Sequence, residues 1–251
     1  MKKVLVIGSI SIDNVVYTKV LPSPGTTVMG DSFISNVGGK GANQACAATF
    51  LGANVSFYGA VGKDSNGEYI KKFLKENGLN YKLKESEKGT GIASITIDTT
   101  SAENRIVIVP GANMDITCDD IDDLEDDFRN SDILLIQLEN PVDTVVYALK
   151  KAKEYGLTTV LNPAPFHELP NEAYQYIDFF VPNEHELNGY VVDQNKSFSD
   201  KAKELISKGT KNVIVTLGEK GSLLVNSNIA IGPQLKEDNP SQFFLRPLKL
   251  H

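Results

Sequence analysis

The stretch ILLIQLENPVDTVVYALKKAKEYGLTTVL, residues 133–161, decides the fold class of this chain. Residues 133–138 are apolar except for Gln137, which predicts a strand buried on both faces. Residues 141–155 begin with a proline and are followed by Gly156, and these two signals predict a helix between them. Residues 158–161 predict a second strand. A strand, a helix and a strand in this order indicate parallel neighbours in an α/β protein.

The same alternation continues on both sides of this stretch. Further strands are expected at residues 3–10, 54–61, 179–181 and 213–216, and further helices at residues 42–51, 64–77, 117–127 and 199–208. Two β-rich segments, about residues 13–36 and 91–109, interrupt the alternation, and we expect them to pair into a small β-sheet lid over a pocket. The chain is therefore predicted to be one α/β domain, residues 1–251, with a doubly wound, mostly parallel sheet and helices on both faces.

Composition and charge exclude several classes of protein. The 32 acidic residues outnumber the 25 basic ones, and the net charge of −7 argues against a nucleic-acid partner. No apolar run approaches the roughly 18 residues of a membrane span.

Cys46 and Cys118 stand far apart, which argues against a zinc site and indicates reduced thiols. Residues 1–13 lack the cleavage site of a signal peptide, so we expect a first strand and a cytoplasmic protein.

The glycine-rich string 38–43, Gly-Gly-Lys-Gly-Ala-Asn, is the most informative local signal for a binding site. Glycines let the backbone approach a ligand closely, and the helix that follows offers free N–H groups at its start. These features indicate a site for an anion or a polyhydroxy ligand. A P-loop is excluded, because Gly41 stands where that motif needs Ser or Thr after the lysine. The alternative is a tight loop at a helix entry.

Carboxylates follow two of the expected strands. In an open parallel sheet, ligands bind beyond the carboxyl ends of the strands, where Asp13 and Glu139 are expected to lie. Both carboxylates could accept hydrogen bonds from ligand hydroxyl groups. The alternative for both is a solvated side chain in a turn, and spacing alone leaves the choice open.

Two more strings follow later strands. Asn183 and Glu186 fit a helix N-cap with its reciprocating glutamate, and they could instead reach a phosphate or a hydrated magnesium ion. Residues 216–221, Thr-Leu-Gly-Glu-Lys-Gly, would let a nucleotide approach closely, although a simple hairpin turn would look the same. The acidic segment 115–127 is interpreted as a solvated helix face, because it lacks the glycine and glutamate spacing of a calcium loop.

Taken together, six strings in a fixed order resemble the ribokinase family of sugar kinases over about residues 1–226. The six strings are Gly8-Ser9-Ile10-Ser11-Ile12-Asp13, Gly38-Gly39-Lys40-Gly41-Ala42-Asn43-Gln44, Gln137-Leu138-Glu139-Asn140-Pro141, Asn162-Pro163-Ala164-Pro165, Pro182-Asn183-Glu184 and Thr216-Leu217-Gly218-Glu219-Lys220-Gly221. The order makes the match far more specific than any single string.

The resemblance implies a three-layer α/β/α domain with a β lid, and a homodimer formed through the lids. It implies transfer of the ATP γ-phosphoryl group to the 5-hydroxyl of ribose, with magnesium and with activation by potassium. The sugar-binding positions would be Ser11, Ile12, Asp13, Gly39, Lys40, Gly41, Ala42, Asn43 and Glu139. The nucleotide-binding positions would be Asn183, Thr216, Leu217, Gly218, Glu219, Lys220 and Gly221. Glu186 would hold magnesium through water, and Ser11 stands where many relatives carry Asn.

One family motif is not found in the chain. Relatives carry Asp-Thr-x-Gly/Ala-Ala-Gly-Asp some thirty residues after the Thr-Leu-Gly string, and its last Asp removes the proton from the attacking hydroxyl. Residues 227–251 do not match the family, and Asp238 has no glycine turn beside it, so we assign no catalytic residue. The potassium site of relatives lies on the same segment. We therefore expect a C-terminally truncated ribose kinase with impaired turnover. The alternatives are a non-catalytic sugar-binding remnant and a family kinase for another sugar or nucleoside.

Overall fold

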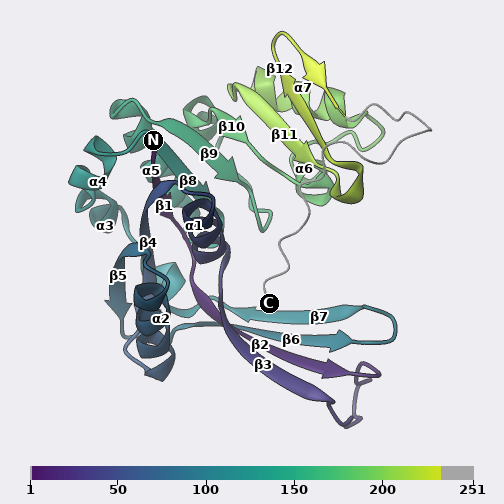
Figure 1. The fold of residues 1–251 in the computed structure, drawn as a ribbon. Helices are drawn as coiled ribbons and strands as arrows, with labels where there is room; N and C mark the ends of the chain where they lie inside the picture. The colour runs from purple at the N-terminus through teal and green to yellow at the C-terminus, as the bar shows by residue number, and fades with distance from the viewer. Residues whose placement is uncertain (1, 233–251) are drawn as a thin grey trace.

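The computed structural model describes residues 2–232, which form a large sheet and a small one (Figure 1). The large sheet has nine strands in the order β13-β12-β11-β10-β9-β8-β1-β4-β5. Its strands are β1 (Lys3–Ile7), β4 (Asn54–Gly62), β5 (Asn80–Ser86), β8 (Ile133–Gln137), β9 (Thr158–Asn162), β10 (Phe179–Phe180), β11 (Asn212–Thr216), β12 (Ser222–Asn226) and β13 (Ala230–Ile231). All neighbours pair in parallel except β11–β12 and β12–β13.

Helices cover both faces of this sheet, because successive strand residues point to opposite sides and both sets are apolar. One hydrophobic core lies between the sheet and α3 (Cys118–Asp122), α4 (Glu125–Arg129), α5 (Val142–Glu154), α6 (Glu184–Gly189) and α7 (Phe198–Ser207). The other core lies beneath α1 (Lys40–Phe50) and α2 (Ser65–Glu76). Short 3-10 helices occur at η1 (Gly111–Asp115), η2 (Asn171–Tyr176) and η3 (Gly218–Lys220). This arrangement is the expected three-layer, doubly wound α/β fold.

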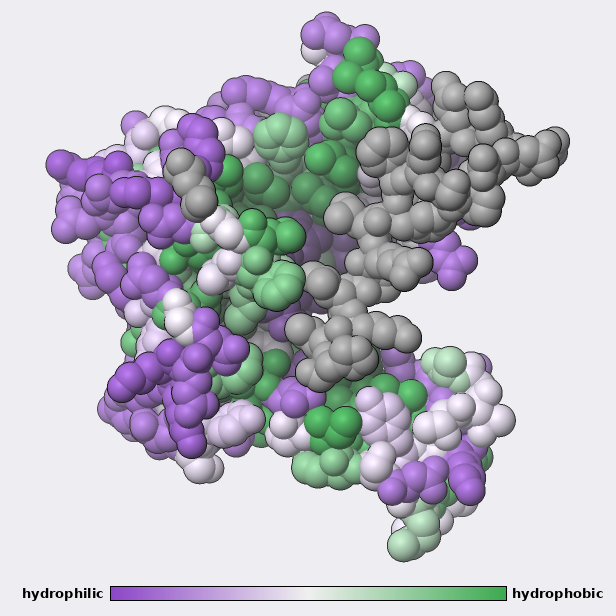
Figure 2. Space-filling model, in the orientation of Figure 1, coloured by the Kyte–Doolittle hydropathy of each residue, from purple (hydrophilic) through white to green (hydrophobic). Residues whose placement is uncertain are grey.

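The face that carries α1 and α2 is only half covered by the described residues. Within residues 2–232, the helices on this face pack over β1, β4, β5 and β8. Farther along the sheet, Val160 on β9 and Val181 after β10 remain half-buried. Figure 2 shows apolar residues gathered on the face turned toward the viewer. Parallel sheets are normally covered on both faces, so this half of the sheet is a surface that a further layer would fit.

The small sheet pairs the two β-rich segments in the order β3-β2-β6-β7. Its strands are β2 (Ser11–Thr18), β3 (Ser32–Gly38), β6 (Gly91–Asp98) and β7 (Asn104–Val109). β2 leaves the large sheet only three residues after β1 ends, so the lid begins at Ser11 and not at residue 13. The β6–β7 hairpin turns at residues 99–103, as expected.

Three details differ from the sequence-based expectations. β5 was not predicted, because its alternating lysines in NYKLKES mark an exposed edge strand. The single helix expected at 117–127 is two short helices, α3 and α4. The break lies at Leu124, whose N–H donates to the carbonyl of Ile121 and tightens the turn. β12 and β13 were also not predicted, and residues 233–251 of the tail that was expected to diverge lie outside the described part of the chain.

In the described range, none of the helices is both long and apolar enough to cross a bilayer.

Candidate active site

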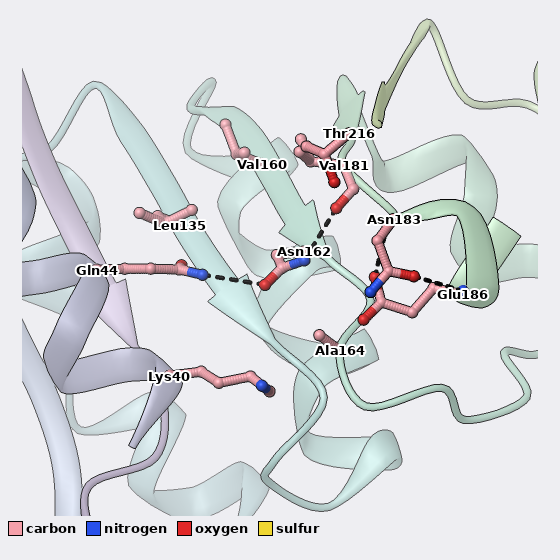
Figure 3. A pocket seen from close by; sticks show the side chains of 10 residues that line it. All are labelled: Lys40, Gln44, Leu135, Val160, Asn162, Ala164, Val181, Asn183, Glu186 and Thr216. Atoms are coloured by element: carbon pink, nitrogen blue, oxygen red, sulfur yellow. Dashed lines mark hydrogen bonds between the residues drawn. The ribbon is translucent and has the colours of Figure 1, made fainter. Parts of the chain in front are cut away.

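Two adjoining cavities lie at the carboxyl ends of the large sheet. The lid pocket has a volume of about 590 Å³ and lies between the strand ends and the small sheet. The strand-end pocket has a volume of about 490 Å³ and lies between α1 and the start of α6. Lys40 lines both cavities. In Figure 3 its side chain extends from α1 toward Asn183 and Glu186 on the opposite side of the strand-end pocket.

Asp13 enters the lid pocket from β2, which carries it out of the large sheet into the lid. The Ser11 hydroxyl donates to Asp13 Oδ1 at 3.0 Å. The paired strand β3 provides Gly38 at this point, and a Cβ there would lie 2.1 Å from Asp13 Oδ2, so glycine leaves the space for this orientation of the Asp13 side chain. Burial raises the pKa of the Asp13 carboxyl, and the Glu139 carboxylate raises it further, against the lowering effects of Ser11 and Lys40. Asp13 is therefore a partly desolvated acceptor that faces the lid pocket.

Glu139 reaches the same pocket from the end of β8 and is bound to the start of α1. Its Oε2 accepts hydrogen bonds from the Lys40 backbone N–H at 3.1 Å and from the Ser9 hydroxyl. Lys40 Nζ lies 3.8 Å from Glu139 Oε1. Free N–H groups and the helix dipole favour a negative charge at this position. The glutamate is thus held in one orientation, with an oxygen beside Lys40.

Ser9 is a site residue that the sequence interpretation missed. It is 2 % exposed, donates to Glu139, and accepts from the Gly41 backbone N–H at 3.3 Å. It lines the lid pocket directly after β1. Its position after a buried strand was the available signal, since that is where the interpretation placed Asp13 and Glu139.

The glycine-rich string packs tightly against the β1–β2 connection. Gly39 has φ +93°, and a Cβ there would lie 2.6 Å from the Cα of Ile10. A Cβ at Gly41 would lie 2.5 Å from the carbonyl carbon of Gly8. The tight-loop alternative is therefore correct for these two glycines. The string also brings Gly39, Lys40 and Asn43 to the lid pocket, so the ligand interpretation stays open beside it.

Three of the expected sugar-binding positions line neither pocket. The side chains of Ile12 and Ala42 are buried in the core beneath α1 and α2, and Gly41 has no side chain to offer. In this structure these three residues can shape the site only through their backbone. The side chains of Ser11, Asp13, Lys40, Asn43 and Glu139 do line the lid pocket.

Asn183 and Glu186 form the helix cap that their spacing predicts. Asn183 N–H donates to Glu186 Oε2, and Glu186 N–H donates to Asn183 Oδ1, both at 2.8 Å. Both side chains also line the strand-end pocket, so the structural and functional interpretations are compatible. Thr216 lies beside them, because residues 183 and 216 form an isolated parallel bridge.

The other residues expected to bind a nucleotide form the turn between β11 and β12. Leu217, Gly218, Glu219, Lys220 and Gly221 line neither cavity, and a Cβ at Gly218 or Gly221 would meet nothing within 4 Å. Both glycines have positive φ, at 58° and 89°. These residues form the hairpin turn that the sequence also allowed, and the turn leaves its backbone open, so the binding interpretation stays open beside it.

A hydrated magnesium ion fits the donor set of the strand-end pocket. Among residues 2–232, no cluster of three or more acidic, histidine or cysteine side chains could enclose a metal. Glu186 supplies one carboxylate whose Oε2 is bound to the Asn183 N–H. Magnesium keeps several waters and needs few carboxylates, so a single glutamate acting through water is chemically adequate.

Asn113, Asn140 and His167 also line the lid pocket and were missed. The Asn113 side chain accepts from the Ile10 N–H at 3.0 Å and donates to the Ile10 carbonyl at 2.8 Å. It thereby ties the end of the lid hairpin to the β1–β2 connection. No sequence pattern joins residues 10 and 113, so only the tertiary structure could reveal this contact.

Comparisons with known proteins agree with this geometry. A family model described as pfkB family carbohydrate kinase matches residues 1–239. Ribokinase from Staphylococcus aureus is 36% identical over 232 residues, which are 90% of this chain and 76% of that protein. A bifunctional ribokinase/ribose-5-phosphate isomerase A from Fructilactobacillus sanfranciscensis is 40% identical over 228 residues. The match covers 88% of this chain and 42% of that protein.

Solved structures give the same result. A Giardia lamblia ribokinase superposes with a TM-score of 0.85 at 31% identity, covering 92% of this chain and 80% of that one. Arabidopsis thaliana ribokinase complexed with ribose and ATP superposes with a TM-score of 0.79 at 30% identity, covering 92% and 77%. The fold and the two adjoining pockets thus define a ribokinase-like α/β protein. The chain belongs to the pfkB family of carbohydrate kinases.

Proposed function

We propose that this chain is a ribose kinase that transfers the γ-phosphoryl group of ATP to the 5-hydroxyl of D-ribose, giving ribose 5-phosphate. One observation carries the proposal: two carboxylates, Asp13 and Glu139, share the lid pocket, and Lys40 joins that pocket to the strand-end pocket. The relatives named ribokinase, one of them solved with ribose and ATP, support the choice of substrates.

The lid pocket suits a neutral polyol. A sugar has no charge, so its affinity and orientation come from directional hydrogen bonds. Asp13 and Glu139 act as acceptors for sugar hydroxyls, and Ser11 and Asn43 add further polar side chains to the pocket lining. Ile12, Gly39, Gly41 and Ala42 contribute backbone shape. Apolar lid residues such as Ile95 and Ile108 close the other side and exclude water, which would compete with ribose as the acceptor.

The strand-end pocket suits the phosphates of ATP. Phosphoryl transfer depends on positioning and on charge stabilisation, so a cation beside both substrates is chemically useful. Lys40 supplies that charge. Asn183 and residues 216–221 hold the nucleotide, and the open turn with Gly218 and Gly221 leaves room for it. Glu186 would hold a hydrated magnesium ion through water, and the bound ion would supply positive charge to the phosphates.

We propose that turnover by the 251 residues is slow. The sequence contains no Asp-Thr-x-Gly/Ala-Ala-Gly-Asp string, which in the family supplies the general base. A general base contributes about 10²–10⁴ in rate. Activation by potassium is expected to be lost with the same segment. The same observation favours a second candidate, a sugar-binding chain without turnover.

We further propose a homodimer formed through the lids and a cytoplasmic location. On β7, Val107 does not line the lid pocket and is 66% exposed. Phe33 on β3, at the other edge of the lid, is 61% exposed. A second lid would cover these surfaces. Cys46 and Cys118 are free thiols, which supports a reducing compartment.

A coupled ADP-release assay tests the activity. The purified chain should release ADP with ribose above the rate without sugar, but far more slowly than Staphylococcus aureus ribokinase assayed in parallel. The Asp13→Asn variant should lose the ribose-dependent part. Equal rates with and without ribose would leave only the sugar-binding candidate, and a larger response to another pentose, a hexose or a nucleoside would replace the substrate.

A further inference from the structure

A row of three side-chain amides crosses the carboxyl ends of the strands, and two of its members, Gln44 and Asn162, line the strand-end pocket. Gln137 at the end of β8 donates from Nε2 to Gln44 Oε1 at 2.6 Å. Gln44 on α1 donates from Nε2 to Asn162 Oδ1 at 3.1 Å. Asn162 at the end of β9 donates from Nδ2 to the Val181 carbonyl oxygen at 2.9 Å. Figure 3 shows the last two bonds of this amide row.

The amide row has a direction, and each member is fixed by its neighbours. Gln44 accepts from β8 and donates to β9, so a carboxylate at this position could make only the first bond. Gln137 is fully buried, and its Oε1 has no hydrogen-bond partner among the described residues. A Cβ at Gly8 would lie 2.0 Å from that oxygen, so Gly8 leaves the space that Gln137 fills. A buried amide with half of its capacity unused is costly, and the bond to Gln44 is what Gln137 gains there.

The amide row joins the sugar side to the nucleotide side. Gln44 lies one helical turn after Lys40, the residue that lines both pockets. Val181 lies two residues before Asn183, which begins the α6 cap. Within residues 2–232, the Gln44–Asn162 bond is the only side-chain hydrogen bond between α1 and β9 or β10. α1 packs on β1, β4 and β8, and Gln44 extends its side-chain hydrogen bonding from β8 on to β9.

We infer that Gln44 is a positioning residue that keeps the lid pocket and the strand-end pocket in a fixed position relative to each other. It keeps Lys40 at a fixed distance from Asn183 and Glu186, so that a sugar in one pocket and a nucleotide phosphate in the other face each other. This inference rests on the proposed function. It predicts that ribose and nucleotide bind cooperatively and that the amide row carries part of this coupling.

Isothermal titration calorimetry tests the inference without requiring turnover. The ribose Kd is measured alone and with a saturating, non-hydrolysable magnesium–ATP analogue. For the wild-type chain the analogue should tighten ribose binding by about fivefold or more. In Gln44→Glu and Gln44→Leu this factor should fall below about twofold, while the Kd for ribose alone stays within about twofold of wild type. Asn162→Leu, which breaks the next bond, should act in the same way.

Gln175→Glu is the matched control, because Gln175 is exposed and its side chain donates to the Glu172 carbonyl and to no member of the amide row. Circular dichroism and thermal melts confirm that each variant is folded. If Gln44→Leu does not fold, the isosteric Gln44→Glu variant carries the test alone.

Wild-type coupling in a folded Gln44 variant would overturn the inference. So would a wild-type chain that binds ribose without coupling, or binds no nucleotide. A merely structural role would weaken ribose binding itself. A wild-type chain that binds no ribose would instead contradict the proposed function.

Discussion

Asp13 combines partial burial with a role as a hydrogen-bond acceptor, and this predicts how sugar binding depends on pH. Burial and the nearby Glu139 carboxylate raise the pKa of Asp13 above its ordinary value of 3.8. Only the ionised carboxylate accepts from two hydroxyls, and protonation converts one oxygen into a donor. Ribose affinity should therefore fall on acidification, beginning at a pH above that of an ordinary aspartate.

Calorimetric titrations with ribose between about pH 4 and about pH 7 measure this effect. The Asp13→Asn variant should bind weakly and with little dependence on pH across that range. A wild-type affinity that does not change with pH would contradict the assignment of Asp13 as an ionised acceptor.

Asp178 predicts the acid sensitivity of the fold. Burial favours its neutral form, but Lys153 and Lys211, each 2.7 Å away, and the Thr159 N–H lower its pKa to about 2. A lowered pKa contributes stability above the unfolded value of about 3.9, and this stability is lost as pH falls toward about 2. Asp178→Asn should lower the free energy of unfolding at neutral pH by about 2 kcal/mol.

Urea denaturation at several pH values tests this prediction, with Asp200→Asn as an exposed control that should change stability little. The difference between wild type and Asp178→Asn should narrow as the pH is lowered below about 4. A difference that stays constant down to acid pH would show that packing, and not charge, is responsible.

At the scale of elements, the exposed edge strand β7 predicts association through the lid. Its six residues are all exposed, and four of them are the apolar side chains of residues 106–109. A charge in this strand should oppose burial against a second lid. Val107→Lys should therefore weaken the proposed dimer by about tenfold or more, because a buried unpaired charge costs several kcal/mol.

Sedimentation equilibrium measures the dimer directly. Val192→Lys is a suitable control, because Val192 is 97% exposed and lies outside the lid. A wild-type chain that is monomeric at all concentrations, or a Val107→Lys dimer as tight as wild type, would contradict association through the lid.

The elements show which parts of the fold the sequence could predict. Buried parallel strands and caps such as Asp64, whose side chain accepts from the Gly67 N–H at 2.8 Å, depend on local patterns and were predicted correctly. β5 alternates charged and apolar residues at a sheet edge, and only its pairing with β4 defines it as a strand. The helix expected at 117–127 breaks at Leu124, where the N–H donates to the Ile121 carbonyl three residues back, a local change of hydrogen bonding that the apolar spacing does not reveal.

The residues of the candidate site also fall into those that local patterns predicted and those that only the tertiary structure reveals. Asp13, Lys40, Glu139 and Asn183 were predicted because each lies just after a strand or at a helix start. The amide row was not predicted, because Gln44 lies 93 residues from Gln137 and 118 from Asn162. Periodicity and local motifs carry no information about such distant pairs.

At the scale of the whole molecule, the two sheets and the cavities between them form one arrangement. The large sheet brings the carboxyl ends of β1, β8, β9 and β11 to one edge, and the small sheet covers the β1–β8 part of that edge (Figure 1). This places the lid pocket beside the strand-end pocket, with Lys40 between them. The chain spans about three quarters of Staphylococcus aureus ribokinase, at 76%.

A calorimetric titration of the purified chain with D-ribose, beside Asp13→Ala and Glu139→Gln variants, tests the central claim most directly. For the wild-type chain we expect a saturable binding isotherm with one site. In each variant the affinity for ribose should fall at least about tenfold, because hydrogen bonds to charged groups contribute about 1.5–3 kcal/mol. If folded wild-type chain gives no heat with ribose, or if both variants bind as tightly as wild type, the lid pocket is not a ribose site.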